Sequence, residues 1–298
     1  WNNCWRNRVK PGPARTGPAE IPGAVRGYRG PLTVAVVPVG DAAVLPAARI
    51  SAELDLPLLD PGIPPDRREG VDLLLQVAPD GLSLQLTGRG CPGAVSAAIG
   101  GARMRHRRRG GHNEHLGRAV GVGGRPAIRV LDATAGLGGD ATVLADLGCQ
   151  VLMCERNPLI AALLADALQR ALHSDDTWLQ RVAGHLSLCA SDAMSLSPAE
   201  IMGIDTIYLD PMFPPRRKSA AVKKEMQLFQ ALIPADGERA NEALLGWALA
   251  QDVARVVVKR PRGEQPLGAM APSHSLPGKS VRFDVHVLRG LGGRREND

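Results

Sequence analysis

The residues with the clearest chemical potential are Asp210-Pro211-Met212-Phe213, which directly follow the apolar run Thr206–Leu209. The carboxylate of Asp210 and the carbonyl of Pro211 can accept the two hydrogens of an exocyclic amine, and Phe213 can stack against a flat base. Hydrogen bonds to both N–H groups favour the pyramidal nitrogen that attacks a methyl group in line, so catalysis comes from positioning and preorganised charge. We therefore predict methylation of an amino group, with Asp210, Pro211 and Phe213 as the catalytic residues.

A second candidate site is the turn that contains Gly136, Gly138 and Gly139, directly after an apolar run that ends at Asp132. Glycines let the backbone turn sharply and let a ligand approach main-chain N–H groups. Dinucleotide-binding proteins use the same device, so the turn alone does not identify the ligand. An acidic residue before the turn suits a cationic methionine group better than a pyrophosphate, and the later Asp-Pro tetrad has no role in hydride transfer. We therefore predict S-adenosyl-L-methionine as the cofactor.

Acidic and hydroxyl side chains after the next two apolar runs can complete a nucleoside site. Glu155 ends the second run, where a carboxylate can accept both ribose hydroxyls, and Ser191-Asp192 follows the third run, within reach of an adenine. In open parallel sheets the ligand lies beyond the carboxyl ends of the strands, so these side chains are expected at the same edge as the glycine turn.

The motifs belong to a regular alternation of short apolar runs and longer helical segments from residue 127 onward. The predicted strands are Ala127–Leu131, Gln150–Cys154, Leu186–Ala190, Thr206–Leu209, Arg255–Val258 and Phe283–Leu288. The predicted helices are Asp140–Leu147, Pro158–Leu172, Lys218–Leu232 and Glu238–Gln251. This rhythm predicts an α/β fold with a doubly wound, mostly parallel sheet.

The N-terminal part of the chain differs in pattern. Residues 31–100 are expected to form a small α/β subdomain, in which the runs Val71–Val77 and Leu82–Leu86 flank Pro79-Asp80-Gly81, a hairpin signal. Residues 1–30 contain six basic residues and one acidic residue, so most of the net charge of +6 lies there. We expect a disordered basic leader (1–30), a basic linker (101–126), the methyltransferase domain (127–290) and a C-terminal tail (291–298).

The composition excludes several protein classes. Hydrophobic residues make up 44% and charged residues 22%, as in ordinary globular proteins. No apolar run reaches the roughly 18–20 residues of a membrane span. The five cysteines are odd in number and form no CxxC pair, and the histidines His112 and His115 have no third ligand at metal spacing. We therefore expect a cytoplasmic monomer without disulfides, metal or membrane attachment.

Basic residues cluster around the candidate site and indicate a nucleic-acid partner. The clusters lie before the cofactor domain, after the Asp210 tetrad, and after the strand Arg255–Val258. Phosphate contacts of this kind position a nucleic acid without reading its sequence. The predicted RNA-binding residues are Arg105, Arg107, Arg108, Arg216, Arg217, Lys218, Lys223, Lys224, Lys259 and Arg260.

Several stretches together resemble one known family, the ribosomal RNA small subunit methyltransferase J family. The similar stretches are Gly100–Arg108, Ala119–Gly121, Asp132–Asp140, Cys154–Pro158, Tyr208–Pro214, Lys218–Met226, Val256–Pro261 and Gly278–Asp284. The resemblance implies a Rossmann-like, class I adenosylmethionine-dependent fold. It also implies transfer of a methyl group to the exocyclic N2 of a guanosine in 16S ribosomal RNA of the small ribosomal subunit.

The resemblance also implies where the cofactor binds. The family's contacts fall on Gly139 and Asp140, Glu155 and Arg156, Ser191 and Asp192, and Asp210. Together with the residues considered above, the predicted cofactor site is Asp132, Gly136, Gly138, Gly139, Asp140, Glu155, Arg156, Ser191, Asp192 and Asp210. This chain departs from the family by having Gly139 where we expect an arginine, and Asp192 where a serine is common.

The residues alone leave other functions open. Related Asp/Asn-Pro motifs serve adenine-N6 and glutamine-amide methylation, and nothing in the residues separates guanine from adenine. A glycine turn also fits an NAD-dependent oxidoreductase, and the basic clusters also fit a non-catalytic RNA-binding assembly factor. These alternatives predict, respectively, a different methylated product, nicotinamide binding, and a function that survives loss of Asp210.

Overall fold

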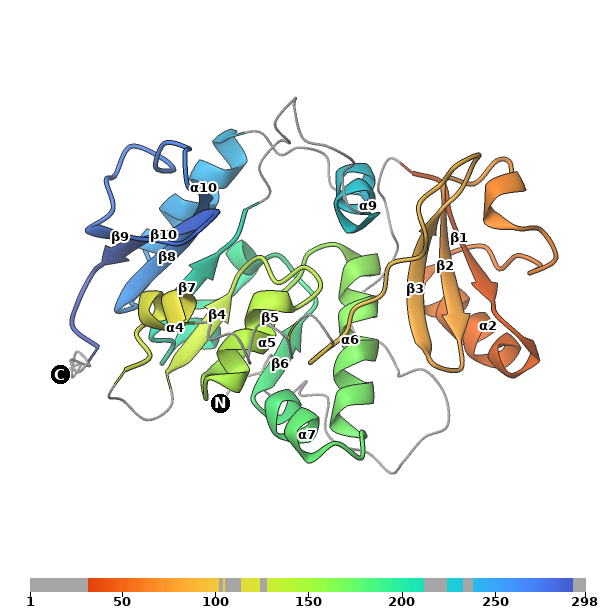
Figure 1. Cartoon of the computed structure of the whole chain (residues 1–298), viewed down its shortest axis with the longest axis horizontal. Helices are drawn as coiled ribbons and strands as arrows, with labels where there is room; N and C mark the ends of the chain where they lie inside the picture. Colours follow the sequence, from red (N-terminus) through yellow and green to blue (C-terminus); the bar gives the residue numbers. More distant parts are fainter. Residues whose placement is uncertain are drawn as a thin grey trace.

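The computed structural model describes residues 32–101, 104, 114–123, 128–211, 224–232 and 238–291. These residues form two β-sheets on either side of one long helix, α6 (Pro158–Leu172), as Figure 1 shows. The smaller sheet belongs to the N-terminal part of the chain, and the larger sheet begins at Arg129. No helix in the described ranges is long and apolar enough to cross a lipid bilayer.

The N-terminal sheet has the strand order β1-β2-β3. Strand β1 (Val34–Pro38) is parallel to β2 (Leu73–Ala78), and β2 is antiparallel to β3 (Gly81–Leu86). The predicted hairpin joins β2 to β3, and Gly81 has a φ of 131°, which favours glycine. Helix α2 (Val44–Leu54), which we did not predict, lies between β1 and β2 in the chain and packs against β1. The predicted small α/β subdomain is confirmed.

The larger sheet has seven strands in the order β6-β5-β4-β7-β8-β10-β9. The strands are β4 (Arg129–Asp132), β5 (Gln150–Cys154), β6 (Leu186–Cys189), β7 (Thr206–Leu209), β8 (Arg255–Pro261), β9 (His274–Pro277) and β10 (Val281–Val287). Strands β4 to β8 pair in parallel, whereas β10 runs antiparallel between β8 and β9. The predicted doubly wound, mostly parallel sheet is confirmed, and two predicted strands match β5 and β7 residue for residue.

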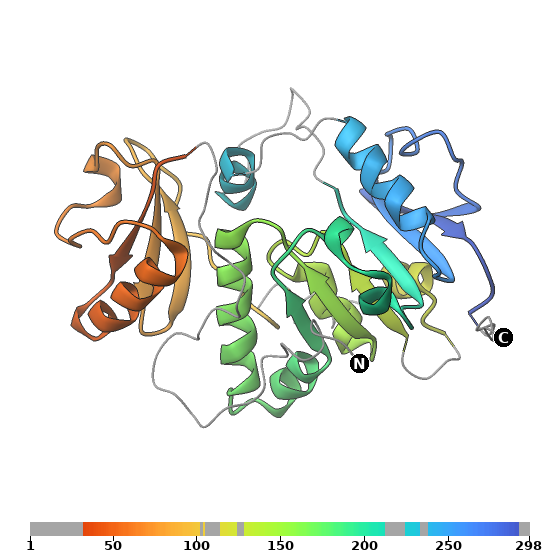
Figure 2. The same ribbon diagram turned by 180° about the vertical axis from the view of Figure 1, so that it is seen from behind.

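Helices cover both faces of this sheet (Figures 1 and 2). One layer contains α4 (Glu114–Val120), α5 (Gly139–Asp146), α6 and α7 (Thr177–Gly184), and the other contains α8 (Pro198–Ile201) and α10 (Glu238–Leu249). Successive residues of a strand face opposite layers, so Val130 lies in one core and Leu131 in the other. A parallel strand buried on both faces needs a continuous apolar run, which is why the strands could be predicted.

Helix α4 lies within the stretch 101–126 that the sequence assigned to a linker. Its residues Leu116, Ala119 and Val120 are buried, and the helix packs against β8 and β10. Val120 also accepts a hydrogen bond through its carbonyl from Thr206 Oγ1 at 2.9 Å. The part of this stretch around α4 therefore belongs structurally to the larger sheet.

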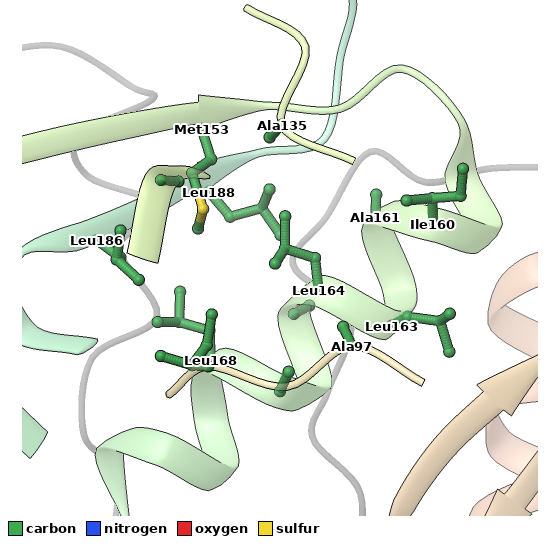
Figure 3. Close-up of a cluster of buried hydrophobic side chains, with 14 of the residues drawn as sticks. Ala97, Ala135, Met153, Ile160, Ala161, Leu163, Leu164, Leu168, Leu186 and Leu188 are labelled. Atoms are coloured by element: carbon green, nitrogen blue, oxygen red, sulfur yellow. The ribbon is translucent and has the colours of Figure 1, made fainter. Parts of the chain in front are cut away.

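Helix α6 is buried on almost every side because the larger sheet packs against one flank and the small sheet against the other. The side chain of Asn157 caps its start by accepting the N–H groups of Leu159 and Ile160 at 3.0 and 3.3 Å, and Pro158 occupies the first turn. One flank packs against the larger sheet, and the other meets β3 and the segment around Ala97. Figure 3 shows Ala97 beside Leu163, Leu164 and Leu168 of this helix.

A buried carboxylate attaches the N-terminal sheet to α6. The side chain of Asp166 is 1% exposed, and its Oδ2 accepts the N–H of Leu82 at 3.1 Å and Arg170 Nε at 2.8 Å. Arg170 also donates to the carbonyl of Ala97 at 3.2 Å. A Cβ on Gly81 would lie 2.7 Å from Asp166 Oδ2, so the hairpin can approach this carboxylate only with glycine there. These contacts fix the small sheet beside the layer that supports the glycine turn.

Candidate active site

The glycine turn connects β4 to α5 and needs glycine at two positions. Gly136 and Gly138 have φ values of 54° and 77°, in the left-handed region. A Cβ on Gly138 would also lie 2.7 Å from Leu164 Cδ1 of α6, which points toward Met153 in Figure 3. Gly139 differs, because its φ is not positive and a Cβ there would meet nothing within 4 Å. The turn therefore tolerates a side chain at Gly139, where the family resemblance implies an arginine.

Glu155 lies next to this turn, directly after β5. Its side chain is buried, and its Oε2 accepts the N–H of Gly136 at 2.9 Å while its Oε1 accepts the N–H of Asn157 at 2.7 Å. Burial raises the pKa of the Glu155 carboxyl, although these backbone hydrogen bonds oppose that rise. The two N–H groups fix the carboxylate, and each of its oxygens can still accept one more hydrogen bond, as a ribose diol requires.

The residues predicted to reach the adenine lie at the end of β6, beside Glu155. Asp192 caps a short 3₁₀ helix, because its Oδ1 accepts the N–H of Met194 at 2.9 Å. Ser191 Oγ lies 3.1 Å from the buried Cys189 Sγ, and the side chains of Ser191 and Asp192 are partly exposed. Arg156 is exposed at the same edge. The structure therefore gathers the four polar residues after β5 and β6 at one sheet edge, because Cys154 and Cys189 are register partners.

Asp210 is tied to the glycine turn by its backbone and by its side chain. Its N–H donates to Thr134 Oγ1 at 2.7 Å, and its Oδ2 accepts Lys259 Nζ at 2.7 Å. Lys259 also donates to Asp140 Oδ2 at 2.7 Å, in the first turn of α5. The hydroxyl of Tyr208 donates to the same Asp140 oxygen at 2.7 Å. The residue predicted for catalysis and the turn predicted for the cofactor therefore share one hydrogen-bonded cluster.

The electrostatics of this cluster are dominated by three neighbouring carboxyl groups. The pKa of Asp132 is raised to about 8, chiefly by burial and also by the charges of Asp140 and Asp210, although the N–H of Thr134 and the charge of Lys259 oppose this rise. Burial also raises the pKa of Asp210, and Lys259 opposes this. For Lys259, burial lowers the pKa, but the carboxylates of Asp210 and Asp140 outweigh burial and hold the amine protonated.

These residues fit the binding of a positively charged nucleoside such as adenosylmethionine. Glu155 provides acceptors for ribose hydroxyls beside Gly136. The first N–H groups of α5 have no partner within the helix and suit a carboxylate. The carboxylates of Asp140 and Asp210 outnumber the single charge of Lys259 and favour a cationic group, and the open space at Gly139 leaves the turn accessible. Among the described residues, no group of three or more His, Cys, Asp or Glu side chains is arranged to hold a metal ion.

The pKa of Asp132 predicts how stability depends on pH. An unfolded Asp ionises near its model value of 3.8, whereas folded Asp132 stays protonated up to about pH 8. Between these values the folded state holds the extra proton, so this group makes stability fall as pH rises. We expect wild type to lose about 2 kcal/mol relative to Asp132→Asn between about pH 6 and about pH 8, since one pKa unit is worth about 1.4 kcal/mol.

Urea unfolding of both proteins at the two pH values measures this difference, and titrating groups that do not interact with Asp132 cancel in the comparison. Parallel stability curves for wild type and Asp132→Asn would show that the Asp132 carboxyl is already ionised at about pH 6.

Two residues predicted to contact RNA make hydrogen bonds within the protein. Lys259 is held between Asp140 and Asp210, and the guanidinium of Arg260 is buried and donates to the carbonyl of Gln265 at 3.0 and 2.6 Å. Pro211 is described and buried. The remaining catalytic and RNA-binding candidates lie outside the residues that the structure describes: Phe213, Arg105, Arg107, Arg108, Arg216, Arg217, Lys218 and Lys223. For Lys224 the backbone is described but the side chain is not.

Two residues of the cluster were missed from the sequence. Tyr208 is one of only two tyrosines in the chain and is the register partner of Asp132 on the neighbouring strand. A buried hydroxyl on an otherwise apolar strand beside an acidic residue was a usable signal. Thr134 carried no comparable signal, because a threonine in a turn usually bonds to its own neighbouring backbone.

Comparisons with known proteins indicate the family and the fold of the chain. Residues 63–288 match the model of a family described as "Putative SAM-dependent methyltransferase". The ribosomal RNA small subunit methyltransferase J of Hahella chejuensis is 49% identical over 203 residues, which cover 68% of this chain and 74% of that protein. The protein of the same name from Cellvibrio japonicus is 44% identical over 256 residues, covering 83% of this chain and 94% of that protein. A crystal structure of a SAM-dependent methyltransferase from Neisseria gonorrhoeae is similar, with a TM-score of 0.63, 32% identity and coverage of 86% of this chain and 96% of that one.

Proposed function

This chain belongs to the ribosomal RNA small subunit methyltransferase J family of SAM-dependent methyltransferases, and on this premise we propose that it methylates the exocyclic N2 of a guanosine in 16S ribosomal RNA. Family membership removes the NAD-dependent oxidoreductase from the alternatives. The choice of guanine-N2 is the finer part of the proposal. It rests on the family resemblance of the sequence motifs, because the residues of the site serve an adenine amine equally well.

The observation that carries the proposal is the link between Asp210 and the glycine turn. Thr134 Oγ1 accepts the Asp210 N–H, and Lys259 joins the Asp210 carboxylate to Asp140 in the first turn of α5. An amine held by Asp210 therefore lies at the sheet edge where a nucleoside cofactor meets Glu155 and Gly136. Proximity of this kind converts a bimolecular transfer into an effectively unimolecular one.

The residues of the chain position the acceptor. Bound adenosylmethionine supplies an electrophilic methyl group on a positively charged sulfur. The Asp210 carboxylate accepts one N–H of the acceptor amine, and the carbonyl of Pro211 accepts the other, which turns the nitrogen lone pair toward the cofactor. Glu155 orients the ribose, and the Asp140 carboxylate favours the cationic end of the cofactor, whose charge would also favour ionisation of the neighbouring Asp132. In this scheme Phe213 stacks on the base.

The proposed partner is the small ribosomal subunit, in the cytoplasm where subunits are assembled. Arginines and lysines before the domain and after Pro214 are proposed to hold RNA phosphates, as the basic clusters suggest. We propose that the protein acts as a monomer, without metal.

Transfer of a labelled methyl group to small subunits from a strain that lacks this gene tests the proposal. Nucleosides from the product are separated and identified by mass spectrometry, with naked 16S RNA as a parallel substrate. We expect N2-methylguanosine as the labelled product. Label in N6-methyladenosine or in protein glutamine would replace the proposed acceptor, and no transfer to either RNA substrate would reject the proposal.

A further inference from the structure

Lys259 lies between the carboxylates of Asp140 and Asp210, a position that the sequence did not predict. It is the residue after Val258, the register partner of Leu209, so Lys259 within β8 lies beside Asp210, which directly follows β7. Its side chain is 24% exposed, and Nζ lies 2.7 Å from both Asp140 Oδ2 and Asp210 Oδ2. An ammonium group has three donors, and two of them are used here. The lysine is therefore engaged within the protein rather than presented to a phosphate.

The contacts of the two carboxylates give this lysine a specific task. Asp140 Oδ2 also accepts the Tyr208 hydroxyl, and Asp132 lies close enough to interact with both Asp140 and Asp210. Carboxylates that share one ammonium group repel one another, even though the Asp210 side chain is 37% exposed, and protonation is the usual relief of such repulsion. Protonation of Asp210 would convert one of its oxygens from an acceptor into a donor. The other oxygen could still accept an amine N–H, but an ionised carboxylate makes the stronger hydrogen bond and repels no donor, so ionised Asp210 holds the amine better.

We propose that Lys259 is a positioning residue for methyl transfer: it keeps Asp210 ionised and fixes its Oδ2, so that Oδ1 faces the acceptor amine. The inference rests on the proposed function, because it takes Asp210 as the group that binds the amine. It replaces the phosphate contact expected for Lys259 from the sequence. The Lys259 side chain acts through Asp210 and does not itself touch the reacting atoms.

The test is the pH dependence of kcat for Lys259→Met and Lys259→Arg, measured on small subunits at saturating adenosylmethionine. Without the ammonium, Asp210 ionises at higher pH, so the acidic limb of the profile should move up by at least about one pH unit. Activity near neutral pH should fall about tenfold or more and recover partly as the pH rises. Lys259→Arg keeps the cation and should keep the wild-type limb with a smaller loss of kcat.

A double variant protects the test against misfolding and isolates the charge effect. In Lys259→Met/Asp140→Asn one repelling carboxylate is removed with the lysine, so the acidic limb should move back toward wild type. The Lys259→Met profile would overturn the proposal if kcat fell equally at every pH. An arginine variant as impaired as the methionine variant would do the same.

RNA binding supplies a readout that does not depend on catalysis. Filter binding of 16S RNA at several salt concentrations should give the same salt slope for Lys259→Met and wild type, because the ammonium releases no counterion from RNA. A slope reduced by about one would make Lys259 a phosphate contact and overturn the proposal. Lys279→Met, at an exposed lysine between β9 and β10, is the matched control for loss of one lysine charge.

The two proposals fail differently. If wild type transfers no methyl group to RNA, the proposed function is wrong. If wild type is active but the acidic limb of Lys259→Met stays in place, only the role assigned to Lys259 is wrong.

Discussion

Replacing Asp210 with alanine is expected to lower kcat for RNA methylation by about 30- to 150-fold or more, which corresponds to about 2–3 kcal/mol of transition-state stabilisation. The loss arises because the carboxylate is proposed to accept the amine N–H only in the geometry that leads to transfer. Lys259 keeps its contact with Asp140, so the cluster retains one of its two ion pairs. Steady-state kinetics with small subunits measure the change in kcat, and calorimetry with adenosylhomocysteine measures cofactor binding separately.

The Asp210 variant should still bind adenosylhomocysteine, with a smaller loss of affinity than Glu155→Ala, because Glu155 and the glycine turn are unchanged. Asp210→Asn keeps one acceptor oxygen and should fall between wild type and alanine. Asp252→Ala, at an aspartate whose side chain is 74% exposed and paired with Arg289, is the matched control. Turnover of Asp210→Ala near the wild-type rate would remove Asp210 from the mechanism.

Replacing Glu155 with alanine is expected to weaken adenosylmethionine binding by at least about 150-fold. Two hydrogen bonds from ribose hydroxyls to a charged acceptor are lost, and each such bond contributes about 1.5–3 kcal/mol. The N–H groups of Gly136 and Asn157 also lose the acceptor that they bond at 2.9 and 2.7 Å. Titration calorimetry with adenosylhomocysteine gives the change in Kd directly.

The Glu155 variants separate cofactor binding from catalysis. Glu155→Gln keeps the shape but replaces one acceptor oxygen with a donor, so its Kd should lie between those of wild type and alanine. At saturating adenosylmethionine, kcat should stay within a few-fold of wild type because Asp210 is untouched. A Kd for Glu155→Ala within twofold of wild type would contradict its assignment to the ribose.

The sequence by itself determined the framework of the site. Buried parallel strands consist of short apolar runs in the sequence, so the strands Gln150–Cys154 and Thr206–Leu209 could be predicted to the residue. The helix Pro158–Leu172 was equally clear, because Asn157 and Pro158 mark its start locally. Since parallel strands end at one edge, the grouping of Asp132, Glu155 and Asp210 followed from the chain order.

Only the tertiary structure decided which of these side chains contact one another. Lys259 and Asp140 are 119 residues apart in the chain, and nothing near Lys259 distinguishes an ion-paired lysine from one that binds phosphate. The sequence assigned Arg260 to RNA binding together with Lys259, but the Arg260 side chain is buried in the protein. Adjacent residues of a strand face opposite sides of the sheet, so the two side chains point in different directions. Local periodicity predicts elements and edges, whereas the partner of a charged group depends on the strand order and register that bring distant residues together.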